Sequence, residues 1–333
     1  MQLEREALRD AFLTRHGWSD AERRLLAADA SFRTYDRLKK PDGSSAVFMN
    51  APPPHEDVGP FVRTTHLLHH YGLYAPKLLA QDVVNGFLLL EDFGDARIAK
   101  VLQNEKSNEL RLYTQAMDAL IALYKQRKEV QHEGVRLYDE AEYLREVGLF
   151  TEWWLPKMMP EKQEAFTKKY LSVWKKLLKQ IPLAEDVLVL RDFHADNLMA
   201  CDDGRLGLLD YQDALMGDAA YDVVSLLEDA RRDVSGQVVQ DCLAYYVQQT
   251  GQKREDFMQC YYLLGAQRNL KILGIFMRLC LRDGKASYLA YMPRVWAHLQ
   301  ADLQHPSLKE LSELMQEIPE SLRIAPDVTG AAA

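Results

Sequence analysis

The spacing of hydrophobic positions along the chain changes near residue 94. Before that point, short β-prone runs are separated by the dipeptides Asp42-Gly43 and Asn85-Gly86, which are typical of hairpin turns. We predict strands at 31–38, 45–50, 77–83 and 87–93, with helices at 3–16 and 57–71.

After residue 94, hydrophobic residues recur mainly with helical spacing. The exceptions are a strand-like run at 188–190 and an apolar hairpin at 198–210. We therefore predict an α+β protein with a small β-rich lobe, residues 1–93, and a larger helical lobe, residues 94–333. The helices predicted for the second lobe are 107–127, 139–149, 162–180, 219–232, 235–249, 255–282 and 286–303.

Composition narrows the class of protein. The 333 residues are 47% hydrophobic and 27% charged, as in ordinary globular proteins. A net charge of −8 argues against a nucleic-acid-binding protein, which usually carries a basic field. No apolar run approaches the roughly 18 residues of a membrane span, and the four cysteines form no CxxC motif. We expect a soluble, cytoplasmic protein without a nucleic-acid or membrane partner.

Chemistry concentrates around the hairpin LMACDDGRLGLLD. If Asp203-Gly204 forms a two-residue turn, Asn197 faces Asp210 at the open end of the hairpin. Directly opposed Cβ atoms lie about 4.5–5.5 Å apart. A carboxylate and an amide oxygen on a stiff frame suit Mg²⁺, which also takes substrate phosphates as ligands. We predict that Asn197 and Asp210 hold Mg²⁺.

Asp192 lies five residues before Asn197, after the strand-like run 188–190. It can orient an acceptor hydroxyl beside metal-bound nucleotide phosphates, as phosphoryl transfer requires. A purely structural alternative exists for each residue taken singly, because Asp and Asn also cap turns and bond local backbone. The combination of D-x4-N, an apolar hairpin and a second Asp favours the functional interpretation.

The segments LRDFHADN and LLDYQD resemble the catalytic and metal loops of the aminoglycoside phosphotransferase and choline kinase superfamily, which has a protein-kinase-like fold. The resemblance extends through MGDAAYDVVSLLEDARRD. The segments DASFRTYDRL, FMNAPPPHED and LLLEDFGD also resemble bacterial cell-wall amino-sugar kinases, which phosphorylate the anomeric hydroxyl of N-acetylmuramate or N-acetylglucosamine.

This resemblance implies roles for individual residues. Asp192 would be the catalytic base, Asn197 and Asp210 the Mg²⁺ ligands, and Asp222 the anchor of the catalytic loop. The first lobe would bind ATP, and the second would supply catalysis and bind the acceptor. Adenine would meet the backbone around three residues at the end of the first lobe, Glu91, Asp92 and Phe93.

The sequence departs from the family pattern at the nucleotide phosphates. The phosphate loop AADASFRTYDRL has no glycine, and Met49 or Asn50 stands near the place of the expected lysine. Arg33 is the first candidate for the missing cation, ahead of Arg37 and Lys39, although a solvated strand position for Arg33 is equally open. Ser31 could assist through its hydroxyl.

Acceptor contacts are less well defined. Asp213 follows the metal-binding Asp and could meet substrate hydroxyls. Arg231 lies in a charged run, residues 228–233, of a kind that is ordinarily a solvated helix face, and Arg268 and Asn269 lie on an otherwise apolar helix. We predict that these four residues contact the acceptor.

The predicted function is ATP- and Mg-dependent transfer of the γ-phosphoryl group to a small molecule, an amino sugar. Two alternatives remain open. The missing lysine and glycines are compatible with a nucleotide-binding pseudokinase. A kinase for an aminoglycoside or choline-like cationic acceptor would need an acidic or aromatic pocket.

Overall fold

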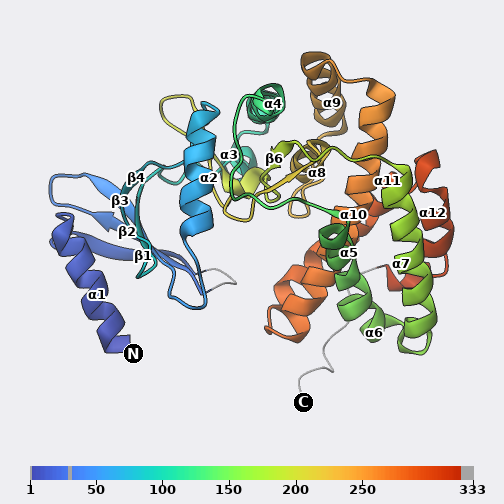
Figure 1. Ribbon diagram of the computed structural model, residues 1–333, viewed down its shortest axis with the longest axis horizontal. Helices are drawn as coiled ribbons and strands as arrows, with labels where there is room; N and C mark the ends of the chain where they lie inside the picture. The colour runs from blue at the N-terminus through green and yellow to red at the C-terminus, as the bar shows by residue number, and fades with distance from the viewer. Residues whose placement is uncertain (1, 29–31, 324–333) are drawn as a thin grey trace. The chain divides into compact units, whose positions relative to one another are not determined.

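A computed structural model describes residues 2–28 and 32–323, and the chain forms two compact units (Figure 1). The first unit comprises residues 1–106 together with 196–214, and the second comprises 107–195 together with 215–333. The chain therefore enters and leaves the first unit twice. The predicted division at residue 93 between a nucleotide-binding and an acceptor-binding lobe is a functional one and stays a prediction.

The first unit is built on an antiparallel sheet. Within the described residues its strand order is β1-β2-β3-β5-β4. The Asp42-Gly43 turn joins β2 to β3, which pair from Thr34↔Asn50 to Lys39↔Ser45. The strands are β1 (Glu22–Ala28), β2 (Thr34–Lys39), β3 (Ser45–Asn50), β4 (Leu78–Asp82) and β5 (Phe87–Glu91).

Helices α1 (Gln2–Arg15) and α2 (Gly59–His70) flank this sheet (Figure 1). Alternate strand residues point to opposite faces, so a strand that is buried on both faces contributes to two apolar layers. Phe12 of α1 packs in one layer with Phe48 and Phe87, which are fully buried. The central strands β3 and β5 are buried on both faces, which explains their continuous apolar sequences.

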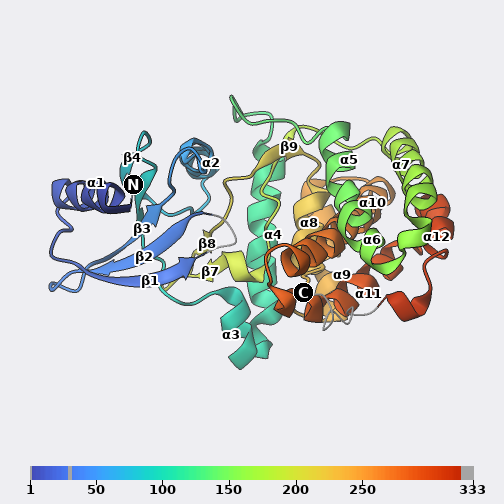
Figure 2. The same cartoon turned by 90° about the horizontal axis from the view of Figure 1, so that it is seen from below.

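The hairpin of β7 (Leu198–Ala200) and β8 (Leu206–Leu208) belongs to the first unit. Figure 2 shows its two strands, β7 and β8. Isolated bridges attach the hairpin to this unit, joining Tyr74 to Gly207 and Arg97 to Met199. Helix α3 (Ile98–Asn104) packs on β7. The apolar segment that carries the predicted metal ligands is thus built into the unit that contains the five-stranded sheet of the described residues.

The predicted register of this hairpin is wrong by one residue. The observed pairs are Leu198↔Leu208 and Ala200↔Leu206, so the turn has three residues, 202–204. Gly204 adopts φ +83°, which fits a three-residue loop that ends in a left-handed residue. Asn197 consequently accepts a backbone hydrogen bond from Leu209, at 2.9 Å, and is not directly opposite Asp210.

The second unit is mainly helical and agrees with most of the predicted helices. Strands β6 (Val187–Val189) and β9 (Leu215–Gly217) pair antiparallel in its interior. Its helices are α4 (Glu109–Gln126), α5 (Glu140–Leu149), α6 (Leu155–Met158), α7 (Gln163–Gln180), α8 (Ala220–Leu227), α9 (Gly236–Thr250), α10 (Arg254–Leu281), α11 (Met292–Asp302) and α12 (Lys309–Met315).

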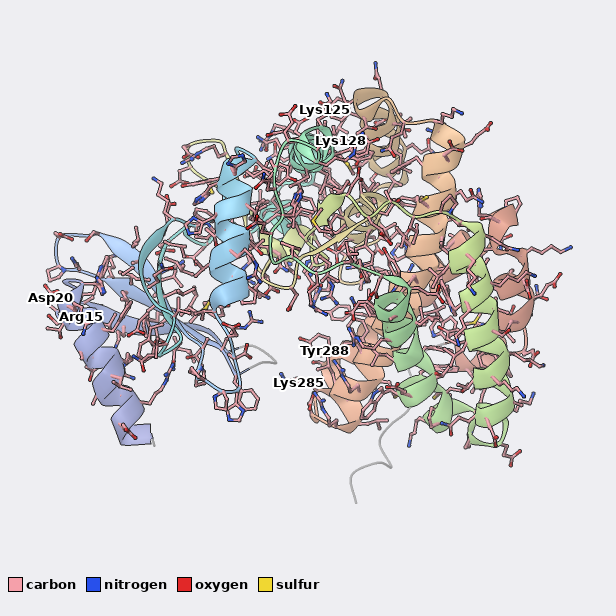
Figure 3. The ribbon with its side chains drawn as sticks, viewed as in Figure 1. Arg15, Asp20, Lys125, Lys128, Lys285 and Tyr288 are labelled. Atoms are coloured by element: carbon pink, nitrogen blue, oxygen red, sulfur yellow. The ribbon has the colours of Figure 1, made fainter. Side chains whose placement is uncertain are left out.

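Helix α10 is the central helix of this unit and packs on α5, α8 and α11. Lys285 and Tyr288 follow its C-terminal end (Figure 3). Gly274 lets α10 approach the end of α5 closely, because a Cβ there would lie 2.3 Å from the Leu149 carbonyl carbon. The Leu149 contact lies where α5 passes into a π-helical segment, Phe150–Trp154.

Helix α8 ends at Leu227, five residues before its predicted end. The first two residues of the charged run that follows are not solvated: Glu228 and Asp229 are 8% and 1% exposed. Asp229 accepts a hydrogen bond from the backbone of Arg231 at 2.8 Å, and such local side-chain bonds compete with helix. None of the described helices has the length and apolarity needed to cross a membrane.

Two hairpin glycines provide a matched pair for testing how closely the backbone packs in the first unit. Gly43 and Gly86 both have left-handed backbones, φ +88° and +66°. A Cβ at Gly86 would lie 1.9 Å from the Ala51 carbonyl oxygen, whereas nothing lies within 4 Å at Gly43. We expect Gly43→Ala to cost about 1 kcal/mol of unfolding free energy and Gly86→Ala roughly 3 kcal/mol or more. Urea unfolding measures both, and equal losses would contradict this account.

Candidate functional site

The loop that carries Asp192 is held by a buried carboxylate. Asp222, in the first turn of α8, accepts hydrogen bonds from the backbone N–H of Leu190 at 2.6 Å and of Arg191 at 2.8 Å. Ser225, one turn further along α8, donates to the carbonyl of Arg191 at 3.1 Å. These are contacts of the kind that the resemblance implies for Asp222. They fix the backbone immediately before Asp192.

The backbone at Arg191 is strained, with φ +70° for a residue that is not glycine. Such conformations persist only where the surroundings enforce them, and they cluster at functional sites. Here the hydrogen bonds between the loop backbone and Asp222 and Ser225 of α8 hold Arg191 in this conformation. Burial raises the pKa of Asp222 to about 7, although its two backbone N–H partners favour the ionised form.

Glu146 of α5 forms the centre of a buried network beside this loop. Its side chain is fully buried and receives Lys271 Nζ at 2.8 Å and Gln267 Nε2 at 3.0 Å, both from α10. The Arg191 guanidinium and the Tyr138 hydroxyl also donate to it. Sequence analysis missed Glu146, because α5 carries several acidic residues and nothing in its pattern distinguishes the buried one.

The network controls the charge of two carboxyl groups. Burial opposes ionisation of Glu146, but Lys271 and Arg191 outweigh this effect and lower its pKa to about 2. Asp192 is half-buried, and burial likewise opposes its charge. Lys271, His194 and Arg191 nevertheless lower the pKa of Asp192 below its ordinary value. Asp192 is therefore a carboxylate at neutral pH.

The structure brings the side chains of Asn197 and Asp210 together in spite of the shifted register. Asn197 Nδ2 lies 3.3 Å from Asp210 Oδ2. Asp210 has φ +57°, so the chain turns as it leaves the hairpin and directs the carboxylate towards Asn197. Gln212 Nε2 donates to the other carboxylate oxygen at 2.9 Å.

This pair of oxygen-bearing side chains fits a hard cation such as Mg²⁺. Rotation of the Asn197 amide would present its oxygen beside the Asp210 carboxylate. The described residues contain no group of three or more His, Cys, Asp or Glu side chains that could hold a metal. A two-residue site matches Mg²⁺, which usually binds one or two protein ligands together with substrate phosphates.

Arg33 lies in the same unit as this pair and is close to Glu56. Its Nε lies 3.6 Å from Glu56 Oε2, with side-chain exposures of 14% and 18%. Burial opposes the guanidinium charge, but Tyr35, Asp210 and Glu56 outweigh it and raise its pKa. The partly buried side chain is not a fully solvated one, and phosphate binding by Arg33 stays a prediction.

The other positions considered for the missing lysine are occupied differently. Met49 is fully buried, and Asn50 accepts hydrogen bonds from Arg5 of α1 at 3.0 and 2.6 Å. Arg37 is engaged by Asp92 at 2.9 Å and by Asp95. Lys39 is exposed at the end of β2. Among these candidates, Arg33 stays the predicted phosphate-binding cation.

The segment Glu91–Phe93 begins at the last residue of β5 and is held by several hydrogen bonds. Tyr74 donates to Glu91 at 2.6 Å, and Asp92 accepts from the Gly94 backbone at 3.0 Å as well as from Arg37. The Phe93 ring lies against β8, where a Cβ at Gly207 would be 2.7 Å from it. The predicted adenine contact of this backbone is untested by the structure and stays a prediction. Ser31 lies outside the described residues.

The predicted acceptor residues are in different environments. Asp213 is exposed, and Arg231 is half-buried with Nη1 3.1 Å from His194 Nε2. Arg268 is 5% exposed and makes a long contact, 3.5 Å, with the Glu228 carbonyl.

Asn269 is fully buried and donates to Glu228 at 2.8 Å and Asp302 at 3.0 Å. Its contacts describe a structural role, so acceptor binding by Asn269 is a prediction without support from this geometry. Acceptor binding by the other three residues also stays a prediction.

The chain belongs to the phosphotransferase enzyme family, whose match spans residues 22–257. Among its relatives is the N-acetylmuramate/N-acetylglucosamine kinase of Pseudomonas aeruginosa, 40% identical over 320 residues, which cover 91% of each chain. The kinase of the same name from Neisseria meningitidis is 34% identical over 314 residues, covering 90% of this chain and 91% of the relative.

Solved structures show the same fold. The choline kinase LicA of Streptococcus pneumoniae aligns with a TM-score of 0.61 at 14% identity, covering 92% of this chain and 99% of the other. An aminoglycoside phosphotransferase in a ternary complex with ADP and hygromycin B aligns with a TM-score of 0.60 at 14% identity, covering 89% and 98%. The predicted two-lobed α+β fold and the family resemblance are thus confirmed.

The Glu146 network predicts a specific dependence of stability on pH. The pKa of Glu146 is lowered from 4.5 to about 2, so its contribution is complete above pH 4.5 and is lost as pH falls through about 2. We expect the difference in unfolding free energy between wild type and Glu146→Gln to shrink by about 2 kcal/mol between pH 6 and pH 3. Urea unfolding at both pH values measures it, and a constant difference would contradict the assignment.

Proposed function

We propose that this phosphotransferase transfers the γ-phosphoryl group of ATP to a hydroxyl of an amino sugar, N-acetylmuramate or N-acetylglucosamine. The observation that carries this proposal is the loop before Asp192, whose backbone is held by hydrogen bonds to Asp222. The same chain also brings together Asn197 and Asp210, which suit Mg²⁺. The acceptor is supported by relatives with that activity in their names, at 33–40% identity over at least 90% of this chain.

In the proposed reaction Asp192 accepts a hydrogen bond from the acceptor hydroxyl and aligns it with the γ-phosphorus. A bond forms between the hydroxyl oxygen and phosphorus while the bond between phosphorus and the β–γ bridging oxygen breaks, and ADP leaves. The hydroxyl proton passes to Asp192. Phosphoryl transfer leaves little covalent chemistry for the protein, so the main contribution of Asp192 is to orient the hydroxyl.

Asn197 and Asp210 would hold Mg²⁺, which supplies charge neutralisation at the nucleotide phosphates. Arg33 would add a second positive charge there, in place of the lysine that this chain lacks. Glu56 keeps the guanidinium partly buried and oriented. The backbone of Glu91–Phe93 would receive adenine. We further propose a cytoplasmic location, with the small-molecule acceptor as partner.

Removal of the Asp192 carboxylate should slow the chemical step without weakening nucleotide binding. We expect Asp192→Asn to lower kcat with N-acetylmuramate or N-acetylglucosamine by roughly 10²–10⁴-fold, since amide nitrogen cannot take the proton. The KM for ATP should change little. Steady-state ADP release, measured with N-acetylmuramate, N-acetylglucosamine, choline and kanamycin, gives both parameters and identifies the acceptor.

The same panel tests the alternatives. Mg-dependent turnover of any of these acceptors excludes a pseudokinase, and faster turnover of choline or kanamycin than of both amino sugars contradicts the proposed acceptor. Near-wild-type kcat for Asp192→Asn on the preferred acceptor would refute the role of Asp192.

Arg33, which directly precedes β2, can be tested against Lys39 at the end of that strand. We expect Arg33→Gln to raise the KM for ATP by about 10-fold or more, the scale of losing one charge-assisted phosphate contact. Lys39→Gln, at an exposed position at the end of β2, should leave it within about twofold. ATP titrations at saturating acceptor measure both, and equal effects of the two variants would remove Arg33 from the phosphate site.

A further inference from the structure

Two buried side chains of the second unit each carry a polar atom that the described residues leave without a hydrogen bond. Asp229 is 1% exposed and His194 is 5% exposed. Asp229 Oδ2 and His194 Nδ1 are both buried, and neither has a hydrogen-bond partner among the described residues. Buried polar atoms are almost always paired, so these two exceptions call for an explanation.

Arg231 connects the two residues. Its backbone N–H donates to Asp229 Oδ1 at 2.8 Å, and its Nη1 lies 3.1 Å from His194 Nε2. His194 itself belongs to the loop that carries Asp192, where its backbone N–H donates to the Asp192 carbonyl at 3.1 Å. A continuous series of contacts therefore leads from the backbone of Asp192 to the carboxylate of Asp229.

The contact with Arg231 fixes the tautomer of His194. A guanidinium has only N–H donors, so His194 Nε2 accepts the hydrogen bond and carries no proton. Burial, followed by Arg231, lowers the pKa of His194, although the carboxylate of Asp229 opposes this change. The ring is therefore neutral, with its proton on Nδ1. The unpartnered atom of His194 is thus a donor, and that of Asp229 is an acceptor.

The turn that carries Asp229 is held in place. Arg294 of α11 donates to the carbonyl of the next residue, Ala230, at 3.0 Å. Because Asp229 Oδ1 already accepts from the Arg231 backbone, the carboxylate cannot turn Oδ2 towards another partner without losing that bond. A polar atom fixed in advance by its surroundings is what a ligand site requires.

One donor and one acceptor fit a ligand that bears hydroxyl groups, because a hydroxyl both donates and accepts. N-Acetylmuramate and N-acetylglucosamine share free ring hydroxyls, and only N-acetylmuramate carries a lactyl carboxylate. The negative charge of Asp229 would repel that carboxylate. The shared hydroxyls are therefore the groups that suit this pair.

We propose that Asp229 and His194 bind hydroxyl groups shared by the two amino sugars, which donate to Asp229 Oδ2 and accept from His194 Nδ1–H. This inference rests on the proposed function, because it names acceptor contacts for the same reaction. Arg231 holds both side chains in position. The chemical step stays with Asp192.

The first experiment measures binding without turnover. Each sugar is titrated calorimetrically into the enzyme with Mg-ADP in place of ATP. In Asp229→Asn the amide oxygen keeps the bond from the Arg231 backbone, and an NH₂ group replaces Oδ2. We expect the Kd for both sugars to rise about 10-fold or more, the scale of one hydrogen bond to a charged group.

Asp233→Asn is the matched control. Asp233 lies in the same charged run, is exposed and pairs with Arg294, so this variant should bind both sugars as wild type does. An unchanged Kd in Asp229→Asn would overturn the inference. A loss confined to N-acetylmuramate would also overturn it, because the proposed contacts are to groups that both sugars carry.

His194 has its own pair of variants. In His194→Gln the amide oxygen takes the place of Nε2 and keeps the Arg231 contact, but no N–H replaces that of Nδ1. In His194→Asn an amide N–H takes the place of Nδ1, and the Arg231 contact is lost. We expect His194→Gln to bind both sugars more weakly than His194→Asn. Equal Kd values or the opposite order would overturn the assignment of His194.

Urea unfolding without a sugar tests whether the carboxylate serves the fold instead. Asp229 Oδ2 has no partner among the described residues, so Asp229→Asn should change the unfolding equilibrium constant by less than about threefold. Both carboxylate oxygens of Asp222 accept backbone N–H groups, so Asp222→Asn should raise that constant about 10-fold or more. Equal losses in the two variants would make Asp229 a structural residue and overturn the inference.

These outcomes separate the inference from the proposed function. If wild type binds the sugars but transfers no phosphate to them, the proposed function fails, and the Kd values still decide the inference. If wild type phosphorylates a sugar that Asp229→Asn binds equally well, the inference fails and the proposed function stands. Binding of neither sugar to wild type would overturn both.

Discussion

The hydrogen bonds from the Leu190 and Arg191 backbone to Asp222 are the constraint on which the rest of the site depends. They fasten an irregular loop to the first turn of a helix that is entirely buried, so the loop inherits the rigidity of the core. Loss of this carboxylate would leave two buried N–H groups without acceptors, each costing about 1–3 kcal/mol. The loop before Asp192 is therefore part of the packed interior, although it has no regular secondary structure.

The buried network around Glu146 fixes charged side chains in the same way that Asp222 fixes the loop backbone. Several donors meet at a carboxylate with no solvent exposure, and two of them are cations. Such an arrangement is stable only when every member is present, because removal of one partner leaves an uncompensated buried charge. The acidic loop residue Asp192 thus acquires its properties from helices far away in the sequence, α5 and α10.

Much of this could be predicted from the sequence. Apolar periodicity located most of the long helices, and the Asp-Gly and Asn-Gly dipeptides located the hairpins. The resemblance carried by LRDFHADN and LLDYQD indicated the correct family. The register of the 198–208 hairpin could not be predicted, because a DDG turn can close with two or three residues and both leave apolar strands.

The partners of the buried polar residues could not be predicted from the sequence either. Nothing in the sequence of α5 marks Glu146 as the buried acid, and nothing in α10 shows that Lys271 pairs with Glu146 while Asn269 pairs with Glu228. Strand β1 and helix α12 were also missed, since ERRLLAA lacks alternation and KELSELM is short. These features depend on contacts between segments far apart in the chain, which local patterns do not record.

Arg191 and Asp210 share one more property: each adopts a left-handed backbone that glycine would adopt at no steric cost. An L side chain in this region is disfavoured by roughly 1–2 kcal/mol. Glycine would relieve this strain at Asp210 only by deleting the carboxylate proposed for Mg²⁺, and at Arg191 it would also remove a cation from the buried Glu146, which costs more than the strain. The two residues set a limit on how far this protein can be stabilised without loss of its chemistry.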